Sequence, residues 1–237
     1  MVPEMDPLER VFANLDQWRH LPAYQLERRA DIFFSVYLKG VVEEETGVAL
    51  EEEMLPELPI KRDVVWSERP GHASVKVDYV LFSKDRRRVF FVELKTDARS
   101  RRDAQDEYLE AAKRLGFRKI VQGVCDILLE TKAHQKYHHL VSALVRLGYL
   151  TMPADLQEFV YPAPRVGLTR RLREIRVTDN DAVVEVLYVQ PEATEGVRAI
   201  DFIRFAAYVA RFDDPLSRAF ASHLLKWRSA AGSSEPV

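Results

Sequence analysis

The segment 77–97, VDYVLFSKDRRRVFFVELKTD, constrains the fold more than any other part of this chain. Two runs typical of β-strands flank a basic turn, and both runs are apolar on both faces. A strand that is apolar on both faces is covered on both sides, as in the centre of a sheet. Three charged residues, Asp78, Glu93 and Lys95, interrupt these runs where hydrocarbon is expected.

The relative positions of these charges depend on the register of the predicted hairpin. If Ser83 pairs with Arg88, the residue numbers of paired positions add up to 171, and Asp78 lies opposite Glu93. Lys95 then shares a face with Glu93, because side chains along a strand alternate with a period of two. A slip of one residue would move Asp78 to the opposite face. The register is therefore a prediction that a structure can test.

Two carboxylates side by side on partly buried strands repel each other, so this arrangement needs compensation. A proton, the ammonium group of Lys95 or a bound divalent cation could supply it. Oxygen ligands converging from two strands suit hard cations. The pattern therefore favours Mg²⁺ or Mn²⁺ held by Asp78 and Glu93.

Asp78, followed after about fifteen residues by Glu93-Leu94-Lys95 on an adjacent strand, resembles the PD-(D/E)XK nuclease superfamily. The resemblance implies that the two acids and the carbonyl group of Leu94 bind metal and that Lys95 activates the attacking water. It also implies a restriction-endonuclease-like fold, with one long helix before the hairpin and another helix after it.

Further family features are matched less closely. Val77 stands where the family name has proline. RecB-like members carry Gln-x-x-x-Tyr on the following helix, whereas Gln105 and Tyr108 here are one residue closer together. Positions i and i+3 still share a helical face, so both residues are candidates for the catalytic site. Many members also place an acid on the first helix, and here Glu27 is the candidate ligand, with Asp31 an equal competitor.

The expected fold is α/β, with a small mixed central sheet flanked by helices. A restriction-endonuclease-like core is expected over about 24–115, and a C-terminal elaboration with additional helices and a β-hairpin over about 118–228. We expect one domain over 1–228 and a disordered tail over 229–237. Hydrophobic periodicity predicts helices at 7–19, 24–45, 100–115, 118–148, 198–211 and 215–228. Strands are predicted near 62–66, in the 77–95 hairpin, and at 173–178 and 183–190.

Charge is unevenly distributed along the chain, although the net charge is only −2. Residues 84–102 contain eight basic side chains and three acids, a local excess that can bind a polyanion. Residues 43–58 contain seven glutamates and no basic residue. With the resemblance, the basic segment predicts a nucleic-acid partner, DNA in the first place. The candidate phosphate-binding residues are Arg86, Arg87, Arg88, Arg99, Arg101 and Arg102. Solvated charged turns are the alternative.

A second hypothesis treats the chain as a catalytically inactive nuclease-like domain that serves as a binding or assembly module. Lys95 would then neutralise the acids without metal, and the acidic stretch 43–58 would contact a partner. A zinc site at His134 and His138 is a third alternative, but Gln135 stands where HExxH has glutamate. A homodimer is also considered, since superfamily enzymes that cut both strands often pair.

Cysteine content and hydropathy favour a cytoplasmic location. Cys125 is the one cysteine, lies in an apolar helical pattern and is expected to be buried and inert. The N-terminal residues have no apolar stretch of signal-peptide length. No run approaches the roughly 18 apolar residues of a membrane span.

Overall fold

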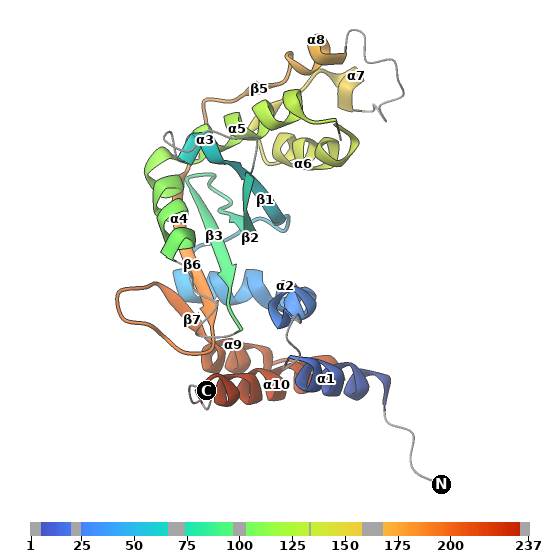
Figure 1. Cartoon of the computed structure of the whole chain (residues 1–237), viewed down its shortest axis with the longest axis vertical. Coiled ribbons are helices and arrows are strands. Elements are labelled where there is room, and N and C mark those ends of the chain that lie inside the picture. The colour runs from blue at the N-terminus through green and yellow to red at the C-terminus, as the bar shows by residue number, and fades with distance from the viewer. Residues whose placement is uncertain are drawn as a thin grey trace. The chain divides into compact units, whose positions relative to one another are not determined.

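The computed structural model shows an α/β protein in which a mixed five-stranded sheet is flanked by helices (Figure 1). The residues that it describes are 6–19, 25–65, 74–96, 103–132, 134–157 and 168–232.

Among these residues, the five-stranded sheet has the order β1-β2-β3-β6-β7, and β4 and β5 form a separate antiparallel pair. The strands are β1 (Leu55–Lys61), β2 (Ser74–Phe82), β3 (Arg88–Leu94), β4 (Leu150–Thr151), β5 (Arg176–Val177), β6 (Val183–Gln190) and β7 (Ala199–Asp201). The helices are α1 (Pro7–Trp18), α2 (Leu26–Thr46), α3 (Arg62–Val65), α4 (Asp103–Leu115), α5 (Phe117–Glu130), α6 (His134–Arg146), α7 (Ala154–Gln157), α8 (Leu168–Leu172), α9 (Phe202–Val209) and α10 (Pro215–Gly232).

The register predicted for the β2–β3 hairpin is confirmed for the pairs that the structure defines. Antiparallel pairing joins Tyr79 to Val92 and continues to Phe82 and Val89, so the paired numbers add up to 171. Every residue from 79 to 82 and from 89 to 94 is buried. Both faces of the hairpin are therefore covered, as the uninterrupted apolar pattern predicts.

The C-terminal half of the chain supplies two strands of the same sheet. The amide of Val183 donates to the carbonyl of Arg87, and the amide of Lys95 donates to the carbonyl of Val189. The two bonds follow each other in the same direction along both strands, so β6 runs parallel to β3. Because β6 also pairs in parallel with β7, the sheet extends beyond the predicted core at 24–115.

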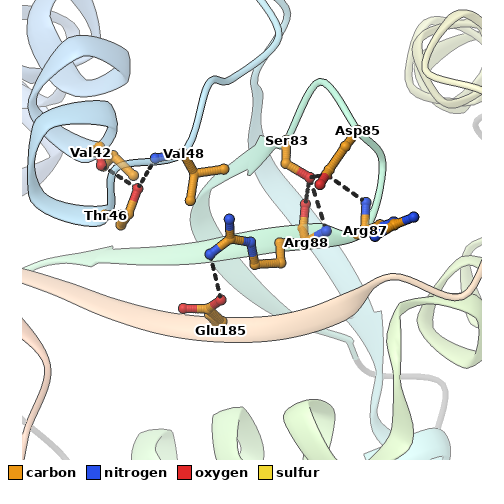
Figure 2. A network of polar contacts seen from close by, with 8 residues as sticks. All are labelled: Val42, Thr46, Val48, Ser83, Asp85, Arg87, Arg88 and Glu185. Atoms are coloured by element: carbon orange, nitrogen blue, oxygen red, sulfur yellow. Dashed lines mark hydrogen bonds and ion pairs between the residues drawn. The ribbon is translucent and has the colours of Figure 1, made fainter.

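Helix α2 begins and ends close to the predicted limits of 24 and 45. Its C-terminus is closed by Gly47, whose φ of 67° is the left-handed conformation that glycine adopts without strain. The hydroxyl of Thr46 donates to the carbonyl of Val42 over 2.7 Å and accepts from the amide of Val48 over 3.3 Å (Figure 2). These bonds fix the point at which the chain leaves the helix.

Three of the predicted elements have different forms in the structure. The strand predicted near 62–66 is wrong: β1 ends at Lys61 and the short helix α3 follows. In this helix Val64 lies against Gly123 of α5. The helix predicted over 118–148 is two helices, because Thr131 has an extended conformation that ends α5. The helix predicted from 198 begins at Phe202, after strand β7.

The hairpin predicted from the strands at 173–178 and 183–190 does not form. Strand β5 pairs with β4, whereas β6 joins the five-stranded sheet. The acids between β5 and β6 contact helix α5 instead. Asp179 forms an ion pair with Arg118, and Asp181 accepts a hydrogen bond from the backbone amide of Arg118.

The chain divides into two compact units, each made of segments distant in sequence. Unit 1 comprises Met1–Val48, Glu93–Arg102 and Leu187–Val237, and unit 2 comprises Ala49–Val92 and Asp103–Val186. Strands β3 and β6 each contribute residues to both units. Neither unit coincides with the predicted core or elaboration, and the single domain over 1–228 stays a prediction. Helix α10 continues to Gly232, and the remainder of the predicted tail lies outside the described residues.

Unit 1 has a core of aromatic rings from its helices. The ring of Phe220 on α10 lies 5.1 Å from that of Phe34 on α2 and 6.2 Å from that of Phe12 on α1. The carboxylate of Asp16 accepts hydrogen bonds from Trp227 and from the ring nitrogen of His223. Helices α1, α2 and α10 are therefore held together by ring packing and by one shared acid.

Cys125 is buried in α5, as predicted, and burial raises the pKa of its thiol to about 11. At pH 8 only ~0.1% of such a thiol is the reactive thiolate. We expect a disulfide reagent such as DTNB to modify native protein far more slowly than urea-unfolded protein, which should release one equivalent of chromophore. Rapid release from the native protein would show that Cys125 is accessible.

Candidate active site

Glu93 and Lys95 form a buried ion pair at the end of β3. The carboxylate of Glu93 has no exposed surface, and Lys95 is 7% exposed. The ammonium nitrogen of Lys95 lies 3.6 Å from Oε2 of Glu93. Removing two charges from water costs several kcal/mol per ion before their attraction offsets it. A buried ion pair in an otherwise apolar strand therefore needs an explanation.

The backbone of β6 fixes the position of this pair. The amide of Lys95 donates to the carbonyl of Val189 over 2.8 Å, which anchors the chain directly after β3. Residues 93 and 95 then point to the same side because of strand alternation. The adjacent buried side chain of Gln190 is occupied elsewhere: its amide donates to the carbonyl of Glu192 and the hydroxyl of Thr194.

Of the two candidate acids on α2, Glu27 is the one that contacts the chain directly after β3. The hydroxyl of Thr96 donates to Oε2 of Glu27 over 3.3 Å, and Arg19 donates to the carbonyl of Thr96 over 3.5 Å. Asp31, the competitor, accepts a hydrogen bond from the neighbouring amide of Ile32. Glu27, Glu93, Lys95 and Thr96 all belong to unit 1.

The remaining predicted ligands and helpers occupy other positions. Asp78 is half-buried on β2 in unit 2, and Leu94 is the last residue of β3. The hydroxyl of Tyr108 donates to the carbonyl of Lys76 over 3.0 Å, so it is committed to the backbone of β2. Gln105 belongs to α4, and its side chain lies outside the described residues.

No group of three or more His, Cys, Asp or Glu side chains that could hold a metal is found in the part of the chain that the structure describes. His134 and His138 lie one turn apart on α6, as their spacing predicts. Nε2 of His138 lies 3.4 Å from the hydroxyl of Ser142, within hydrogen-bonding distance. Glu93 and Asp78 remain the acids that the sequence hypothesis assigns to a metal.

The turn between β2 and β3 is held by a small polar network (Figure 2). The hydroxyl of Ser83 donates to Asp85 over 2.6 Å and accepts from the amide of Arg88 over 2.9 Å. The carboxylate of Asp85 also accepts a hydrogen bond from the amide of Arg87 over 3.0 Å. These bonds lower the pKa of Asp85 below its ordinary value, with the Ser83 bond the largest cause. These bonds hold the backbone from which the basic side chains of the turn extend.

The six arginines predicted to bind phosphate differ in their surroundings. Arg86 and Arg87 are exposed, whereas Arg88 is half-buried and lies 3.9 Å from Glu185 of β6. Arg86 has a φ of 57°, a left-handed conformation that is uncommon outside glycine, asparagine and aspartate. The predicted contacts of Arg99, Arg101 and Arg102 lie outside the described residues.

The acidic stretch 43–58 is largely matched by basic residues far away in sequence. In unit 1, Glu44 pairs with Arg211 and Glu45 with Arg204, and the Arg211 hydrogen bond is the main cause that lowers the pKa of Glu44. In unit 2, Glu53 pairs with Arg146. These pairs give the stretch an intramolecular role that its local sequence does not reveal.

None of the described helices combines the length and the apolar character needed to cross a membrane. Comparison of the chain with models of protein families, with curated proteins and with solved structures found no match.

Proposed function

We propose that the protein is a metal-dependent phosphodiesterase that hydrolyses nucleic acid, with DNA as the first substrate to test. The observation that carries the proposal is the fully buried carboxylate of Glu93 with the ammonium group of Lys95 beside it, at the end of a central strand. Buried ionisable groups with specific charged partners occur preferentially at functional sites.

The arrangement of the hairpin supports this proposal. Its pairs follow the register that the sequence predicts, and we propose that the register continues by one residue to Asp78 and Glu93. Helices α2 and α4 precede and follow the hairpin along the chain, as the resemblance to the PD-(D/E)XK superfamily implies. The restriction-endonuclease-like fold and the family assignment are part of the same proposal.

In this proposal Asp78, Glu93 and the carbonyl of Leu94 provide the hard oxygen ligands that suit Mg²⁺ or Mn²⁺. Glu27, joined to the same strand end through Thr96, is the candidate fourth ligand. Such a cation would polarise a phosphate and lower the pKa of a bound water. Lys95 would orient that water and balance the negative charge that develops on the phosphate.

A binding or assembly module without catalysis is the second candidate, and one observation favours it. Lys95 already lies 3.6 Å from Glu93, so the ammonium group can neutralise the buried acid without metal. Under this alternative, divalent cations would leave stability unchanged, and replacing Asp78 would alter stability more than any activity.

Metal-dependent stabilisation and cleavage together test the proposal. We expect Mn²⁺ to raise the melting temperature of the wild type, because a ligand that binds the native state stabilises it. Asp78→Ala and Lys95→Ala should lower the cleavage rate by about 10²–10³-fold or more. Glu185→Gln, an acid on the adjacent strand β6, is the matched control and should keep its activity.

Purified protein would be assayed with single-stranded and double-stranded DNA and RNA, in Mg²⁺ and in Mn²⁺. If it cleaves none of them and calorimetry detects no uptake of either metal, the proposal fails. A folded protein that shows neither cleavage nor stabilisation by metal would favour the binding module instead.

A further inference from the structure

Among the exposed basic side chains of unit 2 that form no ion pair with an acidic side chain of the described residues, six belong to two neighbouring regions. Three lie in the β2–β3 turn, one lies on α8, one directly follows α8, and one begins β5. They are Lys84, Arg86, Arg87, Arg170, Arg173 and Arg176, and we call them the basic surface.

A direct contact joins the two halves of the basic surface. The guanidinium group of Arg86 lies against Gly148 so closely that an added Cβ would sit 2.9 Å from its Cζ atom. The φ of Gly148 is 79°, which glycine tolerates. Gly148 accepts a hydrogen bond from the hydroxyl of Thr178, directly after β5, and β4 follows Gly148 in the chain. The turn therefore meets the β4–β5 pair.

The second half of the basic surface is a short distance along the chain from the contact between Arg86 and Gly148. Thr178 lies beside Gly148, and Arg176 pairs with Thr151 in the β4–β5 ladder. Two residues of strand span about 7 Å. Arg173 precedes β5 by three residues, and Arg170 is one turn earlier in α8. These three arginines thus lie on the segment that leads to Thr178, which contacts Gly148 as Arg86 does.

Three acids close to the basic surface are engaged by other groups. Glu174 forms an ion pair with Arg171 over 3.1 Å, and Asp179 pairs with Arg118 over 2.9 Å. Asp85 accepts from Ser83 and from a backbone amide within the turn. Glu51, whose backbone amide donates to the carbonyl of Phe82 beside the turn, is a second acid close to Arg86. The two acids offset two of the six cations, so the basic surface keeps a positive excess.

We propose that the basic surface binds the phosphate backbone of nucleic acid. Five of its six members are arginines, whose planar guanidinium groups bond phosphate oxygens in pairs. Arg86 keeps its cation at a left-handed position where glycine is usual, and such outliers often mark functional sites. The inference rests on the proposed function for its choice of polyanion and adds β4–β5 and α8 as a second contact region.

An anionic membrane is the competing partner, and the distribution of apolar side chains disfavours it. Membrane surfaces are bound by basic residues together with exposed large apolar groups. Among the described residues of unit 2, Val183 is the exposed large hydrophobic side chain, and the others belong to unit 1. A single valine provides little area for insertion into lipid.

Binding without metal tests the inference separately from catalysis. The full-length protein would be titrated into labelled duplex DNA in EDTA, with fluorescence anisotropy recorded between about 50 and 200 mM salt. The test variant is Arg170→Gln/Arg173→Gln/Arg176→Gln. Its matched control is Arg10→Gln/Arg28→Gln/Arg29→Gln, which removes three exposed arginines from α1 and α2 of unit 1.

The test variant should bind at least about tenfold more weakly, and its plot of log affinity against log salt should be shallower by about 2.7, which is about 0.9 per lost phosphate contact. The control variant should bind like the wild type. Arg86→Gly, which removes the cation at a conformation glycine accepts, should weaken binding without lowering the melting temperature.

If both triple variants lose DNA affinity equally, the effect is one of net charge and the inference is overturned. Unchanged DNA affinity in the test variant would also overturn it. If the test variant no longer binds phosphatidylserine vesicles but binds DNA like the wild type, the basic surface is a membrane-binding surface instead. Because EDTA excludes metal-dependent cleavage, failure here leaves the nuclease proposal standing. Conversely, the protein could bind DNA through these arginines and yet cleave no nucleic acid. That result would support the basic surface and refute the nuclease proposal.

Discussion

Lys95→Met is expected to lower the free energy of unfolding by about 3–5 kcal/mol, because it leaves the buried carboxylate of Glu93 without its ammonium partner. The side chain of Glu93 has no contact with solvent, so water cannot replace the lost attraction. Methionine has a similar length and flexibility, which limits the cavity that the replacement creates. The predicted loss is therefore mainly electrostatic.

Urea unfolding would measure this effect, and a double variant would assign it. Lys95→Met/Glu93→Leu removes both charges and should recover most of the lost stability, since a well-packed apolar pair often equals a buried ion pair. Lys76→Met breaks an exposed ion pair with Glu57 and should change stability by less than about 1 kcal/mol. If Lys95→Met costs no more than this control, the pair is not a buried one in solution.

The same variant also bears on the metal proposal. If Glu93 is a metal ligand, Mn²⁺ should restore part of the stability of Lys95→Met, because a cation then replaces the missing ammonium charge. Under the binding-module alternative, Mn²⁺ should have no such effect. This comparison needs no substrate and no active preparation.

Phe220→Ala is expected to lower the free energy of unfolding by about 3–5 kcal/mol, the cost of removing a fully buried phenylalanine ring. This ring is at the centre of the aromatic core of unit 1. Its neighbours within 6.2 Å are Phe12, Phe33, Phe34, Tyr37, Phe205 and Trp227. Alanine would leave a cavity that rings on four helices must fill.

Thermal and urea unfolding of the purified variant would measure this loss. Leu225→Ala, five residues later on the same helix, is the control, because its side chain is 47% exposed and should matter by about 0.5 kcal/mol or less. Similar losses for both variants would indicate that the Phe220 ring is not enclosed as the structure shows.

The sequence predicted those elements whose structure depends on local pattern. The hairpin register followed from the apolar runs and from the pairing of Ser83 with Arg88, and the structure confirms both. The first helix was predicted within one residue, and the last begins at the predicted residue 215, since their apolar spacing follows the helical period. Burial of Cys125 followed from the same periodicity.

Features set by distant contacts could not be predicted in this way. Val64 and Val65 are β-branched, yet residues 62–65 form the short helix α3, and Val64 lies against Gly123 of α5. The glutamates at 44 and 45 looked like an exposed acidic surface because their arginine partners lie 159 to 167 positions later. The place of β6 beside β3 depends likewise on pairing across about 95 residues, which no local pattern encodes.

The candidate site was predictable to the same extent. Glu93 and Lys95 are two residues apart, so strand alternation alone places them together, and the structure confirms this. The bond of Tyr108 to the Lys76 carbonyl and the link between Glu27 and Thr96 required the tertiary fold. The contact of Arg86 with Gly148, which joins the β2–β3 turn to the β4–β5 pair, likewise required the tertiary fold.

The interleaving of the two units has a consequence for the order in which the newly made chain can fold on the ribosome. Unit 2 is complete once residue 186 has left the exit tunnel. The aromatic core of unit 1 needs Phe220, so the rings of α1 and α2 lack this partner until α10 has been synthesised. A nascent chain stalled before α10 should therefore present those apolar helix faces to chaperones, and one released after it should not.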